Sequence, residues 1–303
     1  MTGIQNQAYE ATPAGQGGNS TSRSPGKTSF DNIYDLPDPR AYFRTLRPLE
    51  YQIPHHAQHV FRRLLAAHTP VTGRDGPVTV LDLCCSYGIN AALLNHDVTL
   101  GDLYERYTND RRSRLSTARL AEEDRAFYGA RRLPHTARVT GLDAARNAVA
   151  YGRASGLMSD GFGEDLEHDE PSRNLIRALE PVRLITVTGG IGYITSRTFE
   201  RLLPHMAGPV WVAAFVLRTI SYGPIVDALA GAGLVTQKAT SRTFPQRRFS
   251  SPDEQRSAVE AIEAAGLSPA GKESAGYYHA DLYLSRPTAH AAAFPVSDLL
   301  EGG

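Results

Sequence analysis

The sequence predicts an α/β protein, in which a mostly parallel sheet carries helices on both faces. Three observations support this class. Helix and strand signals alternate along most of the chain, as a parallel sheet requires. The run VTVLDL (78–83) is short, apolar and rich in β-branched residues, which is typical of a fully buried strand. With 303 residues, 41% of them hydrophobic and 21% charged, the chain has a globular composition and can bury a large core.

Two segments precede this strand. Residues 1–28 are rich in Gly, Ser, Thr, Asn and Gln, and ordering them would cost more entropy than their burial returns. We therefore expect a disordered tail. In residues 29–70, apolar side chains such as Val60, Phe61 and Leu64 recur at helical spacing, so we expect two or three amphipathic helices.

The remaining elements follow in order between residues 75 and 288. We expect helices at about 88–95, 147–157, 195–206, 222–234 and 251–267, and a polar helical stretch at about 99–132. We expect further strands at 137–143, 182–190, 210–217 and 277–287. The last helix has a clear start signal, because Ser251 precedes Pro252 and Glu254. Residues 289–303 are expected to form a C-terminal tail.

The charge balance and the cysteine content limit the classes of partner and the cellular compartment that we expect. The chain has 32 Lys and Arg residues against 32 Asp and Glu residues, so no net field attracts nucleic acid or an anionic membrane, and we expect neither as a partner. A disulfide between the adjacent Cys84 and Cys85 would be strained and would close no loop. No apolar run reaches membrane-spanning length, and the first residues lack a signal-peptide pattern. We expect a cytoplasmic protein, and the sequence leaves a homodimer open.

The stretch VLDLCCSYGIN (80–90) contains the first strand-to-helix turn, next to which α/β sheets usually bind their ligands. Cys84, Cys85, Ser86 and Gly88 are small enough for backbone N–H groups to approach a ligand. The G-x-G-x-x-G pattern of a pyrophosphate-binding turn is absent. A reactive thiol at the helix N-terminus is an alternative, although no C-x-x-C motif supports it.

At this turn the sequence resembles the class I S-adenosylmethionine-dependent methyltransferases. Their first motif, D-x-G-x-G-x-G, corresponds here to D-L-C-C-S-Y-G, in which Asp82 and Gly88 match while Cys84 and Ser86 replace two glycines. The resemblance covers about residues 75–287. It implies a Rossmann-like, doubly wound, mostly parallel seven-stranded sheet, with S-adenosylmethionine as the cofactor and the helices of residues 29–70 as an N-terminal lid.

Three later segments resemble the family's other motifs. VTGLDAARNAVAYGRASGL resembles the second, in which an acid at a strand end binds both ribose hydroxyls, a task that suits the two acceptor oxygens of a carboxylate. GEDLE and LITVTGGIGYIT resemble the third and fourth, which meet adenine and pass close to the cofactor. The residues implied for cofactor binding are Tyr51, Asp82, Cys84, Ser86, Gly88, Asp143, Ala144, Asp165, Leu166, Thr188, Gly189 and Gly190.

Asp102 is a rival for the ribose-binding acid. It lies 20 residues after Asp82, which is the spacing found in dinucleotide-binding folds, whereas Asp143 lies 61 residues after it. We favour Asp143, because V-T-G-L-D followed by a helix is the stronger strand-acid-helix unit. This choice makes residues 97–137 a helical insertion.

Four residues are candidates for catalysis. His55 and His56 belong to HHAQH, where His55 and His59 share a helix face and suggest an imidazole near the substrate; no third ligand is nearby, so we predict no metal site. Tyr193 and Tyr222 follow the ends of two strands, at the edge where ligands bind. The run RTFPQRR (242–248) suggests an anion site or a solvated loop.

The predicted function is methyl transfer from S-adenosylmethionine to a nitrogen, oxygen or carbon atom of a small molecule, with a role in specialised metabolism. The methyl group is already activated by a positive sulfur, so such an enzyme mainly aligns its acceptor and excludes water. Two alternatives stay open: a Rossmann-type oxidoreductase, and a non-catalytic nucleoside-binding regulatory protein.

Overall fold

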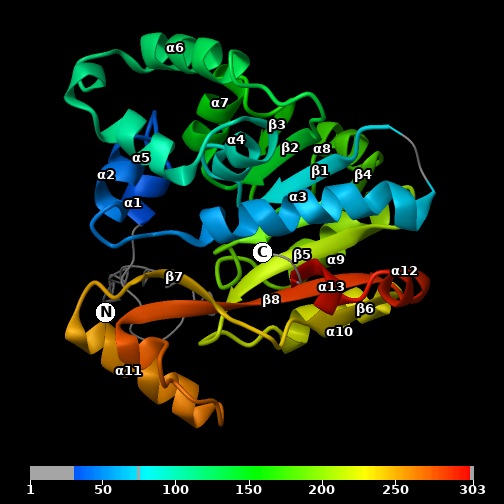
Figure 1. The fold of residues 1–303 in the computed structure, drawn as a ribbon. Helices are drawn as coiled ribbons and strands as arrows, with labels where there is room; N and C mark the ends of the chain where they lie inside the picture. Colours follow the sequence, from blue (N-terminus) through cyan, green and yellow to red (C-terminus); the bar gives the residue numbers. More distant parts are fainter. Residues whose placement is uncertain (1–30, 74–75, 301–303) are drawn as a thin grey trace, which may run out of the picture.

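An eight-stranded sheet forms the centre of the protein in a computed structural model that describes residues 31–73 and 76–300. The predicted N-terminal tail lies outside these residues. The strand order is β3-β2-β1-β4-β5-β8-β6, and β7 pairs with β8 beside this path. The first five strands in this order are parallel, whereas β8 runs antiparallel to its neighbours (Figure 1). The predicted doubly wound, mostly parallel sheet is therefore confirmed, with β8 as its antiparallel strand.

Five of the eight strands (β1, β2, β4, β5 and β8) lie close to where the sequence predicts them, and no strand is predicted at β3, β6 or β7. Their bounds are β1 (Thr79–Leu83), β2 (Arg138–Asp143), β3 (Asp160–Gly163), β4 (Val182–Thr188), β5 (Trp211–Leu217), β6 (Leu234–Lys238), β7 (Phe244–Arg248) and β8 (Tyr277–Pro287). Every residue of β1 and β5 is buried, as expected for parallel strands with helices on both faces.

The predicted count of seven strands is wrong because the run 242–248 contains β7. β7 and β6 both pair with β8, along the same edge of that strand. β7 pairs with the first part of β8 and β6 with the last part. The charge of Arg247 is buried there in an ion pair with Glu254 at 2.6 Å. The segment is therefore neither a solvated loop nor a free basic run.

Helices cover both faces of the sheet. They are α3 (Ile53–Thr72), α4 (Ile89–Asn95), α7 (Arg146–Ala154), α8 (Arg173–Leu179), α9 (Ser196–Leu202) and α10 (Gly223–Gly231), with α11 (Pro252–Ala264) beside β7 and β8. Because side chains alternate along β1, Val80 joins the apolar cluster under α3, α4 and α7, whereas Leu81 and Leu83 join the cluster under α8, α9 and α10. No helix among the described residues is long and apolar enough to span a membrane.

The chain ends in two short helices. Residues 289–303, predicted as a tail, contain most of α12 (Thr288–Ala293) and all of α13 (Val296–Leu300). Both helices contact α3, and Leu299 is buried in the core. The described part of this segment is thus packed against the domain.

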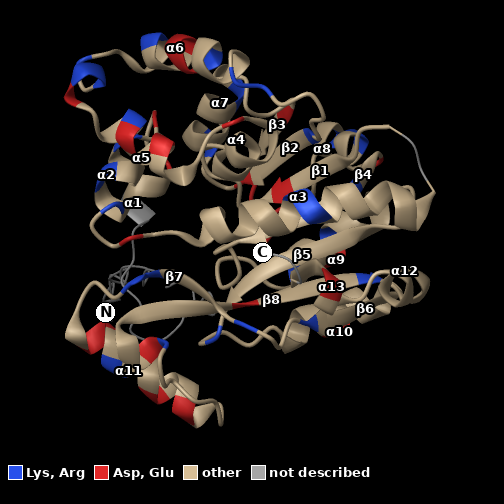
Figure 2. Ribbon diagram, viewed as in Figure 1, with Lys and Arg blue, Asp and Glu red and all other residues tan. Residues whose placement is uncertain are grey.

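The N-terminal helices and the insertion pack against each other. They comprise α1 (Asp31–Tyr34), α2 (Arg40–Leu46), α5 (Leu100–Thr108) and α6 (Thr117–Gly129). Acidic and basic residues are interspersed along α5 and α6 (Figure 2). In the interior of the insertion, Asp124 is fully buried and pairs with Arg106 at 2.6 Å. Asp124 also accepts hydrogen bonds from the hydroxyls of Tyr107 and Tyr151, which tie the insertion to α7.

Candidate functional site

A cavity of about 410 Å³ lies at the carboxyl ends of β1, β2, β3 and β4. Its walls come from the turns that follow these strands and from the predicted lid (29–70). The predicted cofactor residues that line it are Tyr51, Cys84, Ser86, Asp143, Ala144, Asp165, Leu166, Thr188, Gly189 and Gly190. Segments that are far apart in the sequence therefore meet at the sheet edge where α/β proteins bind ligands.

The turn after β1 has an unusual backbone. Cys84, Ser86 and Gly88 have φ angles of 58°, 47° and 83°, and Cys84 and Ser86 occupy two positions where D-x-G-x-G-x-G has glycine. A positive φ is strained in residues with a Cβ atom and free of strain in glycine. The turn thus has the backbone of a glycine-rich turn without two of its glycines, and such strain is often found at ligand sites.

Replacing Ser86 by glycine is expected to stabilise the free protein by about 1 kcal/mol. The change relieves the positive φ and removes a buried hydroxyl that has no hydrogen-bond partner among the described residues, while glycine adds entropy to the unfolded chain. Urea unfolding would measure the gain. Ser155→Gly is the matched control: Ser155 has a φ of −76° and donates a hydrogen bond to the Gly152 carbonyl, so this change should destabilise. A loss of stability in Ser86→Gly would contradict the assignment of strain.

Asp143 lies at the end of β2 and is tied to this turn. Its Oδ2 accepts a hydrogen bond from the Ser86 N–H at 2.8 Å, and its Oδ1 accepts one from the Ala145 N–H at 2.9 Å. Burial raises the pKa of Asp143, and the nearby Asp35 carboxylate adds to the rise. The rival acid, Asp102, does not line the cavity; it closes the capping box of α5 with Thr99.

Asp82 and Gly88 do not line the cavity, although the sequence predicts both as cofactor residues. Gly88 caps the start of α4. Asp82 lies below the cavity, 1% exposed, where its Oδ1 accepts hydrogen bonds from Asn90 and Thr186. Asn90, which does line the cavity, also donates to Thr188 and so connects the buried acid to the cavity wall.

The Asp82→Asn variant is expected to gain stability relative to the wild type as the pH rises. Burial raises the pKa of Asp82 to about 7, and the side chain has no cationic partner among the described residues. From about pH 4 to 7 the folded wild type therefore holds more protons than its unfolded chain, so its stability falls as the pH rises. Asparagine cannot ionise, so the difference in the free energy of unfolding between the variant and the wild type should grow by a few kcal/mol over this pH range. Urea unfolding of both proteins at pH 5 and 8 would measure it; equal differences at the two pH values would contradict the assignment.

The turns after β3 and β4 form the rest of the wall. After β3, Asp165 lies with its Oδ2 2.8 Å from Nδ1 of His168, and the side chain of Leu166 is buried. After β4, a Cβ atom on Gly190 would lie 2.6 Å from the Cys84 Sγ. A Cβ atom on Gly189 would lie 3.2 Å from the Tyr51 hydroxyl. The two glycines therefore allow close packing between β4, the first turn and the lid.

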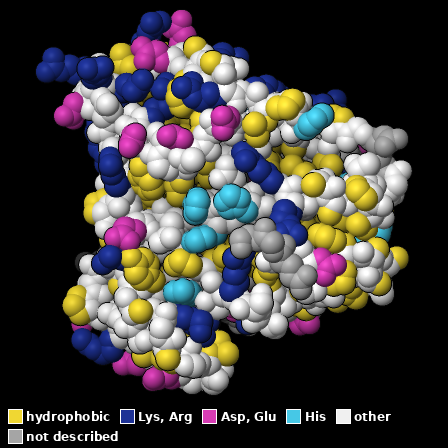
Figure 3. Space-filling view, viewed as in Figure 1, with side chains coloured by type: hydrophobic (Ala, Val, Ile, Leu, Met, Phe, Trp, Pro, Cys, Tyr) yellow, Lys and Arg dark blue, Asp and Glu magenta, His cyan; other side chains and the backbone are white. Residues whose placement is uncertain are grey.

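The catalytic candidates separate into two groups. Tyr193 lines the cavity and packs edge-on against Tyr34 of the lid. His55 and His56 do not line it. They belong to the start of α3, over which Figure 3 shows a group of histidines at the surface. Tyr222 is buried against Tyr283, also away from the cavity. The structure therefore places only Tyr193 of the four where it could contact a ligand.

The two cysteines are unsuited to nucleophilic chemistry. Burial raises the pKa of both thiols well above the usual value, and the nearby Asp143 and Asp82 carboxylates raise it further. Both groups therefore stay protonated, whereas a nucleophilic cysteine needs its thiolate. The structure supports the reading of Cys84 and Cys85 as small residues in a tight turn.

Several cavity residues are not among the site residues that the sequence analysis names. They are Tyr34, Asp35, Tyr42, Pro54, Ile89, Asn90, Glu164, Glu167, His168, Ile194 and Thr198. Ile89 and Asn90 follow directly on the first turn, so their positions could have revealed them. The lid residues could not be found this way, because tertiary contacts alone bring them to the cavity.

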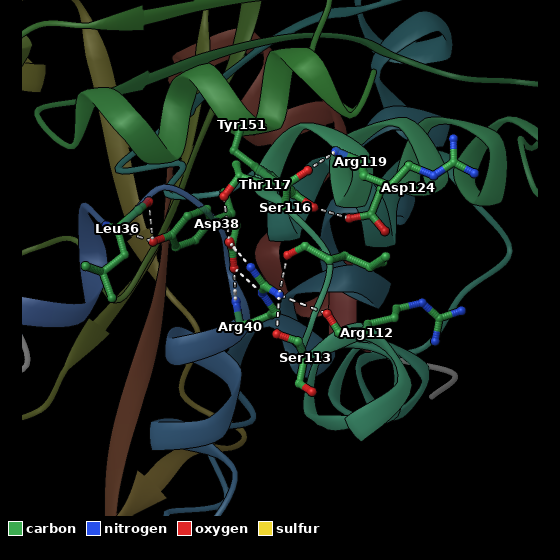
Figure 4. Close-up of polar contacts among 12 residues, drawn as sticks. Leu36, Asp38, Arg40, Arg112, Ser113, Ser116, Thr117, Arg119, Asp124 and Tyr151 are labelled. Carbon is green, nitrogen blue, oxygen red and sulfur yellow. Dashed lines mark hydrogen bonds and ion pairs between the residues drawn. The ribbon is translucent and has the colours of Figure 1, made fainter.

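The lid is fastened to the insertion and to the first turn. Arg40 donates hydrogen bonds to the carbonyls of Arg112, Ser113 and Leu115, and Asp38 accepts one from Thr117 (Figure 4). These contacts link the start of α2 and the loop before it to the segment that leads into α6 and to the start of α6. They fix this part of the predicted lid segment to the insertion.

The cavity is acidic. The carboxylates of Asp35, Asp143, Glu164, Asp165 and Glu167 line it, and no Lys or Arg of residues 31–73 and 76–300 does. Nor is any group of three or more His, Cys, Asp and Glu side chains in this part of the chain arranged to hold a metal ion. The field of these carboxylates favours a cationic or neutral ligand over an anionic one.

Comparison with known proteins gives no close relative. No family model matches the chain, and no curated protein matches it. Matching solved structures include the plantazolicin methyltransferase BpumL in complex with SAH, at 13% identity and a TM-score of 0.38, over 85% of this chain and 98% of that one. Magnesium protoporphyrin IX methyltransferase (ChlM) from Synechocystis PCC 6803 matches at 14% identity and a TM-score of 0.32, over 75% and 80%. Such values establish neither a shared family nor a shared activity.

Proposed function

We propose that this chain is a class I S-adenosylmethionine-dependent methyltransferase that acts on a small molecule. The observation that carries the proposal is the convergence on one cavity of the segments that resemble the family's four motifs. The contact between the Asp143 carboxylate and the Ser86 N–H joins the second of these segments to the first. The doubly wound, mostly parallel sheet, which the resemblance implies, supports the same conclusion.

The cavity residues fit the parts of the cofactor. The Asp143 carboxylate has acceptor capacity left for ribose hydroxyls, since its two oxygens can accept more hydrogen bonds than the N–H groups of Ser86, Ala144 and Ala145 supply. Asp165 and the backbone of Leu166 would hold adenine at the end of β3. The buried Ser86 hydroxyl, which has no partner among the described residues, would gain one from a ligand in the cavity.

The charge of the cavity distinguishes this cofactor from a dinucleotide. S-adenosylmethionine carries a positive sulfur, which the lining carboxylates favour. A nicotinamide or flavin dinucleotide carries a pyrophosphate, for which the cavity offers no Lys or Arg within the described ranges, and the turn lacks the G-x-G-x-x-G cradle. These observations favour methyl transfer over the oxidoreductase reading.

Methyl transfer from S-adenosylmethionine requires few dedicated catalytic groups on the protein. When bound, S-adenosylmethionine supplies a methyl group that its positive sulfur has already activated. The chain would align the acceptor and exclude water, tasks for which the lid tyrosines Tyr34, Tyr42 and Tyr51 and the facing Tyr193 are placed. Burial raises the pKa of Tyr42 and Tyr51, so both stay neutral, and the Tyr42 hydroxyl donates a hydrogen bond to the Tyr51 hydroxyl, which keeps its own proton for another acceptor. We assign no general base, because His55 and His56 lie outside the cavity.

The size and setting of the cavity support a small-molecule acceptor. A space of about 410 Å³ lined partly by the lid suits a small molecule better than a polymer surface. Methylation at nitrogen, oxygen or carbon, a role in specialised metabolism, a cytoplasmic location and a homodimer all stay predictions.

Calorimetric titration tests the proposal. We expect the protein to bind S-adenosylmethionine and S-adenosylhomocysteine with micromolar affinity, on the order of −8 kcal/mol, and to show no heat of binding with NADH. Binding of NADH without either sulfur nucleoside would overturn the proposal in favour of an oxidoreductase.

A further inference from the structure

We infer that Asp35, which the lid contributes, is a second carboxylate of the ribose site and accepts a hydrogen bond from one of the two ribose hydroxyls beside Asp143. This inference rests on the proposed function and adds to it a binding residue that no motif identifies. Asp35 lines the same cavity as Asp143 although 108 residues separate them (143 − 35). The two carboxylates are close enough for Asp35 to contribute to the raised pKa of Asp143.

Two segments hold Asp35 in place: the start of α7 and the turn after β1. Its Oδ1 accepts a hydrogen bond from the Asn147 N–H at 2.6 Å, and its carbonyl accepts one from the Asn147 Nδ2 at 3.0 Å. Next to it, the Leu36 N–H donates to the Tyr87 hydroxyl at 3.1 Å, and this hydroxyl lies 3.2 Å from the Ile33 carbonyl that can accept its proton. Tyr87 belongs to the first turn, so the cofactor turn itself fixes the lid segment that carries Asp35.

This part of the cavity offers acceptor atoms on two carboxylates, and the exposed side chain of Asp35 is accessible to a ligand. The Oδ2 atom of Asp35 has no partner within residues 31–73 and 76–300, and both oxygens of Asp143 can accept further bonds. No Lys or Arg of the described chain lines the cavity to balance the two carboxylates. Two adjacent hydroxyls supply one donor for each carboxylate without adding a negative charge, which is the chemistry of a ribose diol.

The test compares Asp35→Asn with the wild type in calorimetric titrations. The ligands are S-adenosylhomocysteine and its two analogues that lack the 2′- or the 3′-hydroxyl. S-adenosylhomocysteine has no positive sulfur, so a general loss of negative charge should matter little. Asparagine keeps an oxygen that can accept from the Asn147 N–H, so the lid should stay in place, and thermal unfolding without ligand would check this.

We expect Asp35→Asn to bind S-adenosylhomocysteine about tenfold more weakly, as the loss of a hydrogen bond to a charged group predicts. For the analogue that lacks the hydroxyl held by Asp35, the loss should be less than about twofold. Asp102→Asn is the matched control, because Asp102 is an exposed carboxylate away from the cavity, and it should change no affinity by more than about twofold.

Two results would overturn the inference while leaving the proposed function intact. One is unchanged affinity of Asp35→Asn for S-adenosylhomocysteine. The other is an equal loss for all three ligands, which would show that Asp35 acts on another part of the cofactor or on the lid. If the wild type binds none of the three ligands, the proposed function itself fails.

Discussion

Asp143→Ala is expected to weaken binding of S-adenosylhomocysteine by about tenfold to a hundredfold, or roughly 1.5–3 kcal/mol, because the ribose hydroxyls lose a charged acceptor. The variant also loses the hydrogen bonds from Ser86 and Ala145 that hold the turn after β1. Calorimetric titration measures the loss.

The control for this prediction is Asp102→Ala. Asp102 caps α5 away from the cavity, so its removal should leave the affinity within about twofold. If Asp102→Ala loses binding and Asp143→Ala keeps it, residues 97–137 are not an insertion and the ribose site is misplaced.

Asp124→Ala is expected to lower the free energy of unfolding by about 3–5 kcal/mol, because it leaves a buried guanidinium without its counter-ion. The Arg106 side chain is 6% exposed and that of Asp124 is 0% exposed. The hydroxyls of Tyr107 and Tyr151 lose their acceptor in the same variant. Urea unfolding measures the change.

An exposed ion pair on the same helix is the control for the buried pair of Arg106 and Asp124. Arg119 and Glu122 of α6 are 57% and 69% exposed, so Glu122→Ala should change stability by less than about 1 kcal/mol. A similarly small effect of Asp124→Ala would show that the network around Asp124 does not hold the insertion to α7.

The strands of the sheet were predictable where burial sets the sequence pattern. β1 and β5 are continuous apolar runs because helices cover both of their faces. β3 and β7 carried no such pattern. β3 reads DGFG, and its two glycines have low strand propensity, so pairing with β2 alone makes it a strand. β7 contains Arg247, whose burial depends on Glu254 in the following helix.

The candidate site was predictable where the chain itself forms the wall of the cavity. Residues at the strand ends, such as Asp143 and Thr188, can be placed at the cavity from the strand pattern that precedes them. The positive φ angles of Cys84 and Ser86 could not be predicted from the sequence, because neither residue type favours this backbone conformation. The lid contributes Asp35 through contacts with Tyr87 and Asn147, which no spacing reveals.

His55 lies outside the cavity for a reason that the sequence does contain. The buried face of α3 includes Ile53, Ala57, Val60, Phe61 and Leu64. At 100° per residue, His55 and His59 lie on the opposite face of the same helix. Helical periodicity therefore places them at the surface, where the structure has them.

A crystal structure of the protein with S-adenosylhomocysteine tests the central claim most directly. We predict the nucleoside in the cavity at the carboxyl ends of β1, β2, β3 and β4, with its ribose hydroxyls on the carboxylates of Asp143 and Asp35 and its adenine beside Leu166. A nucleoside bound elsewhere, or a cavity that stays empty in crystals saturated with the ligand, would contradict it.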